Sequence, residues 1–521
     1  MRNDKEIAIV GAGISGLTAC KHIMDKGFRP VVFESWCSIG GVWAHQTIES
    51  TKLQTPKTYY QFSDWPWPSS VTDVFPDHNQ VSEYIKSYAI HFDLLPRIKL
   101  NHKVLAIDYS LPLDDDDDEM YGNWDEWGGN GGPFSDLDGK WKLLVQDNLY
   151  PSEPPKAYEV DFVILCNGNY SNFPNVPQFP TGEGPEIFDG MALHSMEYAS
   201  MSTSHAADFI KDKRVTIVGF QKSAIDIAVE VAKTNGAKHP CTVVYKRAHW
   251  TIPEHLNELH FRVLNRFSEL MIHKPCEGFF LWLLVILLYP LLWMFSTLTE
   301  TYLKWIYPLK KHNMIPKHSF ITQLASCMLP VLPSTFYKRV EGSILLKKSQ
   351  NFHFSKSGIV LDQELTPLAT DIVIFATGFR PDDNFANIFK SQYFQSCILG
   401  SSAPFYRECI HPRIPQVAIL GYSESPSNLY TTEIRSKWLA HFMAGNMKLP
   451  TIEAMEEDTE NWENFMRNYA FKTYKRACIT FLLQIHYNDL LCKDMGCNPR
   501  RKSWFIPELF APYAPTDYAN L

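Results

Sequence analysis

The stretch that decides the fold is EIAIVGAGISGLTAC, residues 6–20. Its apolar start predicts a buried parallel strand, and the residues from Ser15 onward predict a helix. Gly11 permits a tight turn between the two, Gly13 lets the backbone approach a pyrophosphate, and Gly16 lets the helix pack closely on the strand. Phosphates can then bind to the unpaired N–H groups of the helix N-terminus.

The next apolar run, residues 30–33, completes this unit and ends in Glu34. A carboxylate at this position can hydrogen-bond a ribose 2′-OH and would repel a 2′-phosphate, so the unit suits FAD or NAD rather than NADP. Gly40 and Gly41 then allow the backbone to pass close to a flat ligand, with Trp43 following. Taken alone, the glycine pair is equally well explained as an ordinary turn.

The composition indicates a globular protein of two or three domains, since 521 residues are 45% hydrophobic and 20% charged. A net charge of −8 argues against nucleic acid as a partner. The 11 cysteines are scattered along the chain, which is typical of free thiols in a reducing compartment. No set of cysteines and histidines has zinc-ligand spacing, so we expect no metal site.

Residues 114–119 form an acidic run that is followed by a stretch rich in Gly, Trp and Asn. Like charges at this density repel one another, which predicts a solvated loop. A metal site is the less favoured alternative. Strand-like segments resume at 140–145 and 158–165, which predicts an antiparallel meander that returns the chain to the main sheet.

A second strand–turn–helix unit begins with the strand 214–218. The residues at its fingerprint positions are Gly219, Gln221, Lys222, Ser223 and Ala224. Gln221 replaces the second glycine and places a Cβ where the backbone should approach phosphate. We expect the charge of Lys222 to compensate.

The strand that follows, residues 241–245, ends in Lys246 and Arg247 rather than in an acid. Basic residues at this position suit the 2′-phosphate of NADP, with an exposed basic turn as the alternative. Further on, a buried strand, 371–375, ends in Ala-Thr377-Gly378 and predicts another contact between backbone and dinucleotide.

Residues 278–298 hold no charged side chain. As one helix they would span about 30 Å, enough to cross a bilayer, but Pro290 argues against a single smooth span. One crossing would separate strands that must share the nucleotide sites. We therefore expect a shallow pair of helices bent near Pro290, lying in one leaflet with Lys304 and the lysines 310–311 near headgroups. The alternative is packing on the protein's own surface or lining the substrate entrance.

Over about residues 5–445 the chain resembles the class B flavin-containing monooxygenases. The specific element is F-x-G-x-x-x-H-x-x-x-Y, complete at Phe188, Gly190, His194 and Tyr198. Outside this context His194 would be taken as a structural histidine. Related Baeyer–Villiger enzymes have Trp at the position of Tyr198, so the resemblance favours the branch that oxygenates heteroatoms.

The resemblance implies an α/β fold of two doubly wound, Rossmann-like dinucleotide-binding domains. The NADP domain, 208–335, would be inserted into an FAD domain split between 1–207 and 336–450. It would carry a hydrophobic, membrane-associating insertion at 275–311. A helical C-terminal extension, 451–521, has no implied role in the mechanism.

The resemblance also implies the chemistry. NADPH reduces FAD, O₂ adds at flavin C4a to give a hydroperoxide, and one oxygen atom passes to a soft nitrogen or sulfur nucleophile of a small molecule. Gln54 stands where many members carry an Asn that supports the oxygenated flavin. The runs 53–56 and 222–226 look like the plant branch associated with pathogen defence and N-hydroxylation of pipecolic acid. Such a protein would lie on the cytosolic face of the endoplasmic reticulum.

Three alternatives stay open at this point. A membrane-associated NADPH oxidase that mainly releases H₂O₂ shares all these elements. A flavoprotein disulfide reductase needs a C-x-x-x-x-C pair soon after the glycine pair, and Cys37 has no such partner in the sequence. A nucleotide-sensing protein without activity is disfavoured by the two intact FAD elements.

Overall fold

The computed structural model describes most of the chain. The described residues are 4–110, 124–136, 138–170, 173–340, 342–362, 364–400, 405–472, 478 and 481–521. The acidic run 114–119, predicted as a solvated loop, lies outside them.

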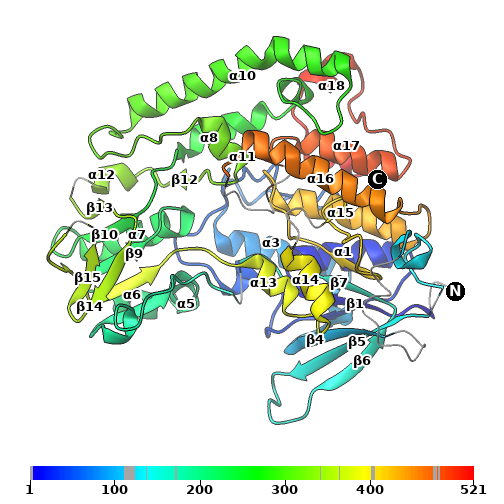
Figure 1. Cartoon of the computed structure of the whole chain (residues 1–521), viewed down its shortest axis with the longest axis horizontal. Helices are drawn as coiled ribbons and strands as arrows, with labels where there is room; N and C mark the ends of the chain where they lie inside the picture. The colour runs from blue at the N-terminus through cyan, green and yellow to red at the C-terminus, as the bar shows by residue number, and fades with distance from the viewer. Residues whose placement is uncertain are drawn as a thin grey trace.

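The first sheet holds the strand of the opening sequence. Its order is β18 (Val417–Ile419), β7 (Phe162–Leu165), β1 (Ile7–Val10), β2 (Val31–Phe33) and β3 (Ile98–Lys99), all parallel. β1 and β7 are buried along their whole length, as an apolar run in a parallel sheet requires. Helix α1 (Ile14–Asp25) packs against α15 (Asn428–Met443), so segments 400 residues apart cover this sheet together (Figure 1).

The second sheet is also parallel and has five strands. Its order is β13 (Ile344–Lys348), β10 (Cys241–Tyr245), β9 (Val215–Val218), β17 (Ile372–Phe375) and β8 (Met191–His194). Helix α7 (Lys222–Asn235) packs against β9 and β10. The two-sheet α/β architecture is the fold class predicted from the sequence.

The observed strand pairing differs from the predicted domain boundaries. β8 was expected in the first part of the FAD domain, and β13 and β17 in the second part. All three pair in the second sheet, with β17 directly between β9 and β8. A short apolar strand carries no signal for which of two similar sheets it joins, so the sequence could not place it.

Three small sheets complete the strands. The predicted meander is confirmed as an antiparallel sheet of β4 (His102–Ser110), β5 (Lys140–Asp147) and β6 (Lys156–Val160). The others are β14 (Phe352–Ser355) with β15 (Gly358–Leu361) and β16 (Leu368–Ala369), and β11 (Ile252–Pro253) with β12 (Val331–Leu332).

Short helices connect these layers. They are α2 (Val42–His45), α3 (His78–His91), α5 (Ser195–Ala199), α6 (Thr203–Ile210), α8 (Glu254–Arg262), α9 (Arg266–Glu269), α11 (Phe320–Ala325), α12 (Phe336–Val340), α13 (Pro381–Ala386) and α14 (Gln392–Gly400).

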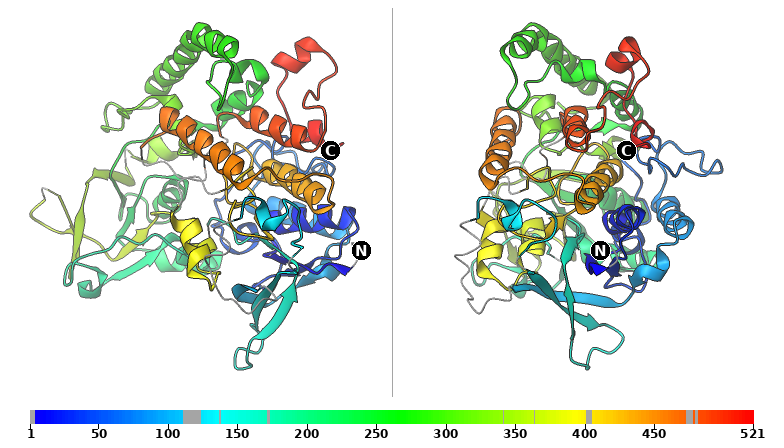
Figure 2. Two further views of the ribbon diagram at one scale, coloured as in Figure 1. Left: turned by 45° about the vertical axis from the view of Figure 1, so that its right-hand side comes forward. Right: turned by 90° about the vertical axis from the view of Figure 1, so that its right-hand side faces the viewer.

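The hydrophobic stretch forms one continuous helix, α10 (Phe279–Ile306), with Pro290 inside it. The expected pair of helices bent at Pro290 is therefore wrong. Proline removes only one N–H donor, and the 28-residue helix keeps the bonds on either side of that position. α10 lies along the outside of the molecule, at the same end as α18 (Phe505–Phe510) (Figures 1 and 2).

The C-terminal extension is helical, as predicted, with α16 (Ile452–Tyr469), α17 (Gln484–Asp494) and α18. Charged groups tie it to the body: the buried Lys437 in α15 donates from Nζ to the carbonyl of Tyr518 at 2.7 Å. Arg266 forms ion pairs with Asp489 and Glu508. The extension therefore packs as part of the main core.

Candidate active site

The first glycine turn has no room for side chains at two of its three positions. Gly11 has φ +102°, and a Cβ there would lie 2.6 Å from the carbonyl oxygen of Cys166. A Cβ on Gly16 would lie 1.8 Å from the carbonyl oxygen of Gly11. These two glycines are therefore required by the protein's own packing, as the sequence pattern predicts.

Gly13 differs, because a Cβ there would meet only the Gly41 backbone, at ordinary contact distances of 3.7 and 3.9 Å. The space in front of this backbone is open to a ligand. The second glycine pair closes over it: Gly40 N–H donates to the carbonyl of Ala12 at 3.0 Å, and Gly41 has φ +59°. The two glycine-rich turns, 30 residues apart, thus form one surface.

Glu34 lies at the end of β2 beside this turn and is 4% exposed. Its Oε2 accepts a hydrogen bond from Ala12 N–H at 2.6 Å, and its Oε1 accepts one from Trp36 N–H at 2.8 Å. These bonds fix the carboxylate where the sequence places a ribose contact. Each carboxylate oxygen can accept a further bond from a ligand hydroxyl.

The helices that follow the two glycine turns begin without side-chain caps. α1 starts after Gly13 and α7 after Gln221. At neither N-cap does a side chain accept a hydrogen bond from the backbone N–H groups of the first helical turn. By contrast, α3 is capped by Asp77. Uncapped N-termini leave N–H donors for an anion, which is what two dinucleotide phosphates require.

The second turn repeats the geometry of the first. Gly219 has φ +130°, and a Cβ there would lie 2.3 Å from the carbonyl oxygen of Ala376. Lys222, expected to offer its charge to phosphate, instead pairs with Asp226 at 2.7 Å. A carboxylate one helical turn away competes for the ammonium group, but Lys222 also lines the cavity described below, so its contact with phosphate stays a prediction. Ser223 lines the cavity described below, and Ala224 is buried against the sheet.

Arg247 and the turn after β17 lie at the same edge of the second sheet. Arg247 is exposed, two residues beyond the end of β10. Asn175 holds the other turn: its N–H donates to Gly378 O at 2.8 Å and its side chain to Thr377 O at 3.2 Å. Asn175 therefore holds the Thr377–Gly378 turn in place.

The signature residues act as a scaffold. A Cβ on Gly190 would lie 2.4 Å from the carbonyl oxygen of Asp371, which explains this glycine. His194 Nδ1 accepts from Met196 N–H and caps α5, and burial lowers the pKa of its imidazole. Tyr198 donates to Glu230 of α7 at 3.1 Å. Phe188 is buried in the core beneath the second sheet.

A cavity of about 1400 Å³ joins the two sheets. The predicted residues that line it are Gly11, Gly13, Glu34, Gly40, Gly41, Trp43, Gln54, Lys222 and Ser223. Those outside its lining are Gly16, Gly219, Ala224, Arg247, Thr377, Gly378, Phe188, Gly190, His194 and Tyr198. The first unit and Gln54 therefore meet the second turn across one space.

Gln54 is bonded to the opposite wall of this cavity. Its Oε1 accepts from Val331 N–H at 3.0 Å, and its main-chain carbonyl accepts from the side chain of Asn257. Thr55, the next residue, donates from its hydroxyl to the carbonyl of Pro426 at 2.9 Å. The loop is thus held from three sides, and the Nε2 group of Gln54 remains as its donor.

The cavity also has an apolar end that the motifs did not predict. Its side chains come from α8, α9, α10, α11 and the residues after α9 and α11, and include Phe261, Phe267, Met271, Leu292, Phe295, Ile321, Leu324 and Leu329. Among them lies His260, whose ring faces Phe295 and Phe320 at 5.5 and 5.4 Å. Burial lowers the pKa of His260 to about 4, so its imidazole is neutral at pH 7.

Sequence reasoning also missed Asn257, the loop 423–426, and Phe481 with Leu482, all of which line the cavity. The last pair corrects the expectation that the C-terminal extension has no role at the site. Pro426 and the serines beside it are turn signals, but nothing local points to a cavity. These residues become neighbours of Gln54 only through the tertiary fold.

The family model "Flavin-binding monooxygenase-like" matches residues 4–127 and 133–509. A "Probable flavin-containing monooxygenase 1" of Arabidopsis thaliana is 36% identical, covering 98% of this chain and 96% of that protein. "Putative flavin-containing monooxygenase 2" of the same plant is 33% identical, covering 96% and 99%. The chain belongs to the flavin-binding monooxygenase-like family.

Solved structures agree on the fold. NADP⁺-bound cyclohexanone monooxygenase from Rhodococcus is 15% identical with a TM-score of 0.66, covering 94% of this chain and 97% of that one. S-allyl-L-cysteine S-oxygenase from Allium sativum is 16% identical with a TM-score of 0.56, covering 95% and 89%. At these identities the likeness shows two Rossmann-like domains and nothing about substrate.

The protein is an NADPH-dependent flavin monooxygenase with FAD as its cofactor. The residues present fit both nucleotides, since the open backbone at Gly13, the fixed Glu34 and the uncapped α1 suit FAD. The uncapped α7 and the exposed Arg247 suit NADPH. Bound flavin supplies the O₂ chemistry, and this chain orients both nucleotides and keeps water away from them.

Proposed function

We propose that this monooxygenase transfers one oxygen atom to a soft nitrogen or sulfur in an apolar small molecule. The observation that carries the proposal is the apolar end of the cavity, beyond Gln54 and Val331. Phe261, Phe295 and Leu292 offer hydrophobic contact there, and the neutral His260 can accept one hydrogen bond from a substrate. An amine or thioether with an aliphatic or aromatic body matches this lining.

N-hydroxylation of pipecolic acid in plant defence is the narrower hypothesis that the resemblance implies. A carboxylate of this kind needs a cationic partner when buried. Within the described lining the lysines and arginines are Lys52, Lys103 and Lys222, and none lies in the apolar end. Lys222 already pairs with Asp226. The lining therefore supports an uncharged body more than an amino acid.

A substrate panel tests both ideas. Purified enzyme is given NADPH and ¹⁸O₂ with an apolar tertiary amine, an apolar thioether or pipecolic acid, and labelled product is counted per NADPH oxidised. We expect efficient coupling with the apolar amine or thioether. Preferred coupling with pipecolic acid would replace the apolar hypothesis. Peroxide as the main product with all three would favour the NADPH oxidase alternative.

We further propose that α10 attaches the enzyme to the cytosolic face of the endoplasmic reticulum. Within the part of the chain that the structure describes, α10 is the one helix long and apolar enough to span a membrane. Its outward side chains include Phe280, Leu287 and Trp293, which are 86, 68 and 66% exposed. Trp504 and Phe505 at α18 are also exposed, at the same end of the molecule (Figure 2).

The mode of attachment follows from the contacts of α10. Glu300 Oε1 accepts from Phe320 N–H at 2.9 Å, and Lys304 lies over the Trp250 ring at 5.4 Å. Val285 and Leu303 are buried. Anchored in this way, α10 would lie in one leaflet rather than cross it. Its cavity-facing Leu292 and Phe295 support the alternative role at the substrate entrance as well.

A further inference from the structure

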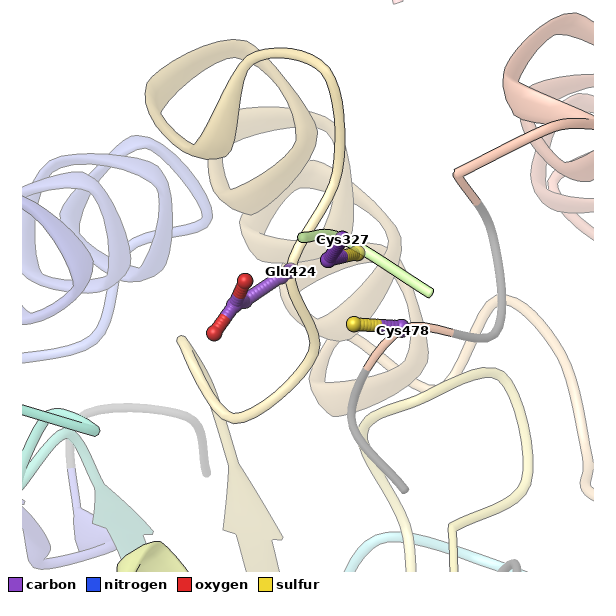
Figure 3. A group of neighbouring side chains, drawn as sticks. All are labelled: Cys327, Glu424 and Cys478. Carbon is purple, nitrogen blue, oxygen red and sulfur yellow. The ribbon is translucent and has the colours of Figure 1, made fainter. Parts of the chain in front are cut away.

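Three potential metal ligands from distant segments meet at the cavity wall. Cys327 follows α11, Glu424 lies in the loop between β18 and α15, and Cys478 belongs to the C-terminal extension. One ligand atom from each lies within 4.8 Å of the other two. In the view of Figure 3 the sulfur atoms of Cys327 and Cys478 lie one above the other, and the carboxyl group of Glu424 lies to the left of both.

The state of these groups suits a cation. Both cysteines are in the thiol form, and Cys478 is buried. Glu424 is 9% exposed and accepts a hydrogen bond from the hydroxyl of Tyr170. Glu424, Cys478 and Cys327 all act electrostatically on that hydroxyl, so the three acids share one small volume. A divalent cation would stabilise all three anionic forms together.

The supporting contacts fix the ligands in place. Ser326, next to Cys327, accepts from the N–H of Phe471 at 3.0 Å, which joins the α11 end to the extension. The Glu424 loop is held by Ser425 N–H, which donates to Asn428 at 2.9 Å. The Tyr170 hydroxyl donates a hydrogen bond to the carboxylate of Glu424 and so orients it, as groups that hydrogen-bond metal ligands do.

We propose that Cys327, Glu424 and Cys478 bind one zinc ion, with a water as the fourth ligand on the cavity side. Two thiolates and a carboxylate form a donor set that zinc accepts in tetrahedral geometry. Bond lengths of about 2.0–2.3 Å place tetrahedral ligand atoms roughly 3.3–3.8 Å apart, so groups that now lie within 4.8 Å of one another need to close in by at most about 1–1.5 Å. The ion would join the α11 end, the β18–α15 loop and the C-terminal extension.

A disulfide between the two cysteines is the competing outcome. It requires a two-electron oxidant, which the three ligand groups do not supply. Zinc displaces the thiol protons directly and gains from the Glu424 carboxylate. Zinc binding needs no oxidant, so the geometry of the cluster favours the ion.

The test measures zinc in the full-length, flavin-loaded protein after dialysis against zinc and then against metal-free buffer. Because the proposed site holds one ion, we expect about one zinc per wild-type chain when the metal content is measured by elemental mass spectrometry. Cys327→Ser and Cys478→Ser should lose it. Cys276→Ser, which removes an exposed cysteine elsewhere, should keep it. If the zinc content per chain of the wild type is no higher than that of Cys478→Ser, the proposal is overturned.

Two further measurements keep the test independent of folding and of activity. Tyr170→Phe should weaken zinc binding by about 10–100-fold, the usual effect of removing a hydrogen bond to a metal ligand. Cobalt substitution should give tetrahedral cobalt–thiolate absorption at wavelengths longer than oxidised flavin absorbs. Zinc-free wild type whose peptide map shows a Cys327–Cys478 disulfide would refute the site. Flavin content reports folding of each variant, and none of these readouts depends on the proposed substrate.

Discussion

At the scale of single residues, Gly13 is the position where function and folding separate. Its φ of −76° is open to any residue, and a Cβ there meets only Gly41 at 3.7 Å. Gly13→Val should therefore fold but lose flavin, because the branched side chain fills the pyrophosphate position. Gly16→Val is the contrasting variant, since its side chain collides with the carbonyl of Gly11 and should prevent folding. Flavin-to-protein ratio and circular dichroism measure both, and folded, fully yellow Gly13→Val would contradict the assignment.

Gln54 offers a test of how the site couples NADPH oxidation to oxygen transfer. Its Oε1 accepts from Val331, so Gln54→Glu keeps that acceptor and removes the amide donor, whereas Gln54→Ala removes both. If the donor supports oxygen transfer, both variants should release more H₂O₂ per NADPH consumed. A peroxide yield raised only in Gln54→Ala would mean that the residue acts by holding the 331 strand. Unchanged yields in both would remove Gln54 from the site.

Arg247 decides cofactor choice if it reads the 2′-phosphate. Arg247→Ala should weaken NADPH binding by about 1.5–3 kcal/mol, the scale of a hydrogen bond to a charged group, and leave NADH nearly unaffected. Lys356→Ala, which removes an exposed lysine outside this turn, is the control and should leave both nucleotides unaffected. The measurement is the KM for each nucleotide. Equal losses for NADPH and NADH would show that Arg247 does not discriminate between them.

At the scale of elements, α10 carries the membrane proposal. Deleting the helix would uncover Val285, Leu292 and Leu303, which are buried, so surface substitutions make a cleaner test. The combined variant Phe280→Ser, Leu287→Ser and Trp293→Ser should move the protein from membrane pellet to supernatant, because each loss removes favourable lipid contact.

The control for α10 removes exposed apolar side chains elsewhere. Leu149→Ser with Leu365→Ser alters residues that are 64 and 100% exposed and lie outside α10. This pair should stay with the membrane fraction. Wild-type protein that is fully soluble without detergent would end the membrane proposal and leave α10 its role at the cavity.

At the scale of the whole molecule, buried histidines predict a loss of stability in acid. Burial lowers the pKa of His411 to about 3, while in the unfolded chain it stays near 6.5. Below pH 6.5 the unfolded chain therefore binds a proton that the folded protein excludes, and stability falls as pH falls toward 3. From pH 7 to pH 5 this one group should cost about 2 kcal/mol.

His411→Gln isolates that contribution. The amide can still accept from Arg413 N–H, as His411 Nδ1 does at 3.0 Å, but it does not titrate. The unfolding free energy of the wild type should fall more than that of the variant between pH 7 and pH 5, by about 2 kcal/mol. Parallel pH profiles in urea titrations would show that His411 is protonated in the folded state.

Features encoded within one contiguous segment were predicted well. Gly11, Gly16 and Glu34 have the contacts that the fingerprint requires, and Gly219 repeats them in the second unit. The partner of Lys222 was missed although Asp226 lies four residues away, because a phosphate and a carboxylate are alternative partners for one ammonium group. The domain boundaries differ from the prediction for another reason. β8, β13 and β17 join the second sheet because they pair with strands distant in the sequence.

The sequence by itself determined the two nucleotide-binding units and the family, because turn, strand and helix signals act over a few neighbouring residues. Only the tertiary structure decided what surrounds them. Gln54 meets Val331 across 277 positions, and Cys327 meets Cys478 through packing of the extension. α10 stays continuous because helix bonds on both sides outweigh one proline. The cavity walls and the ligand cluster form from contacts between segments that are far apart in the sequence, so no local spacing of residues predicts them.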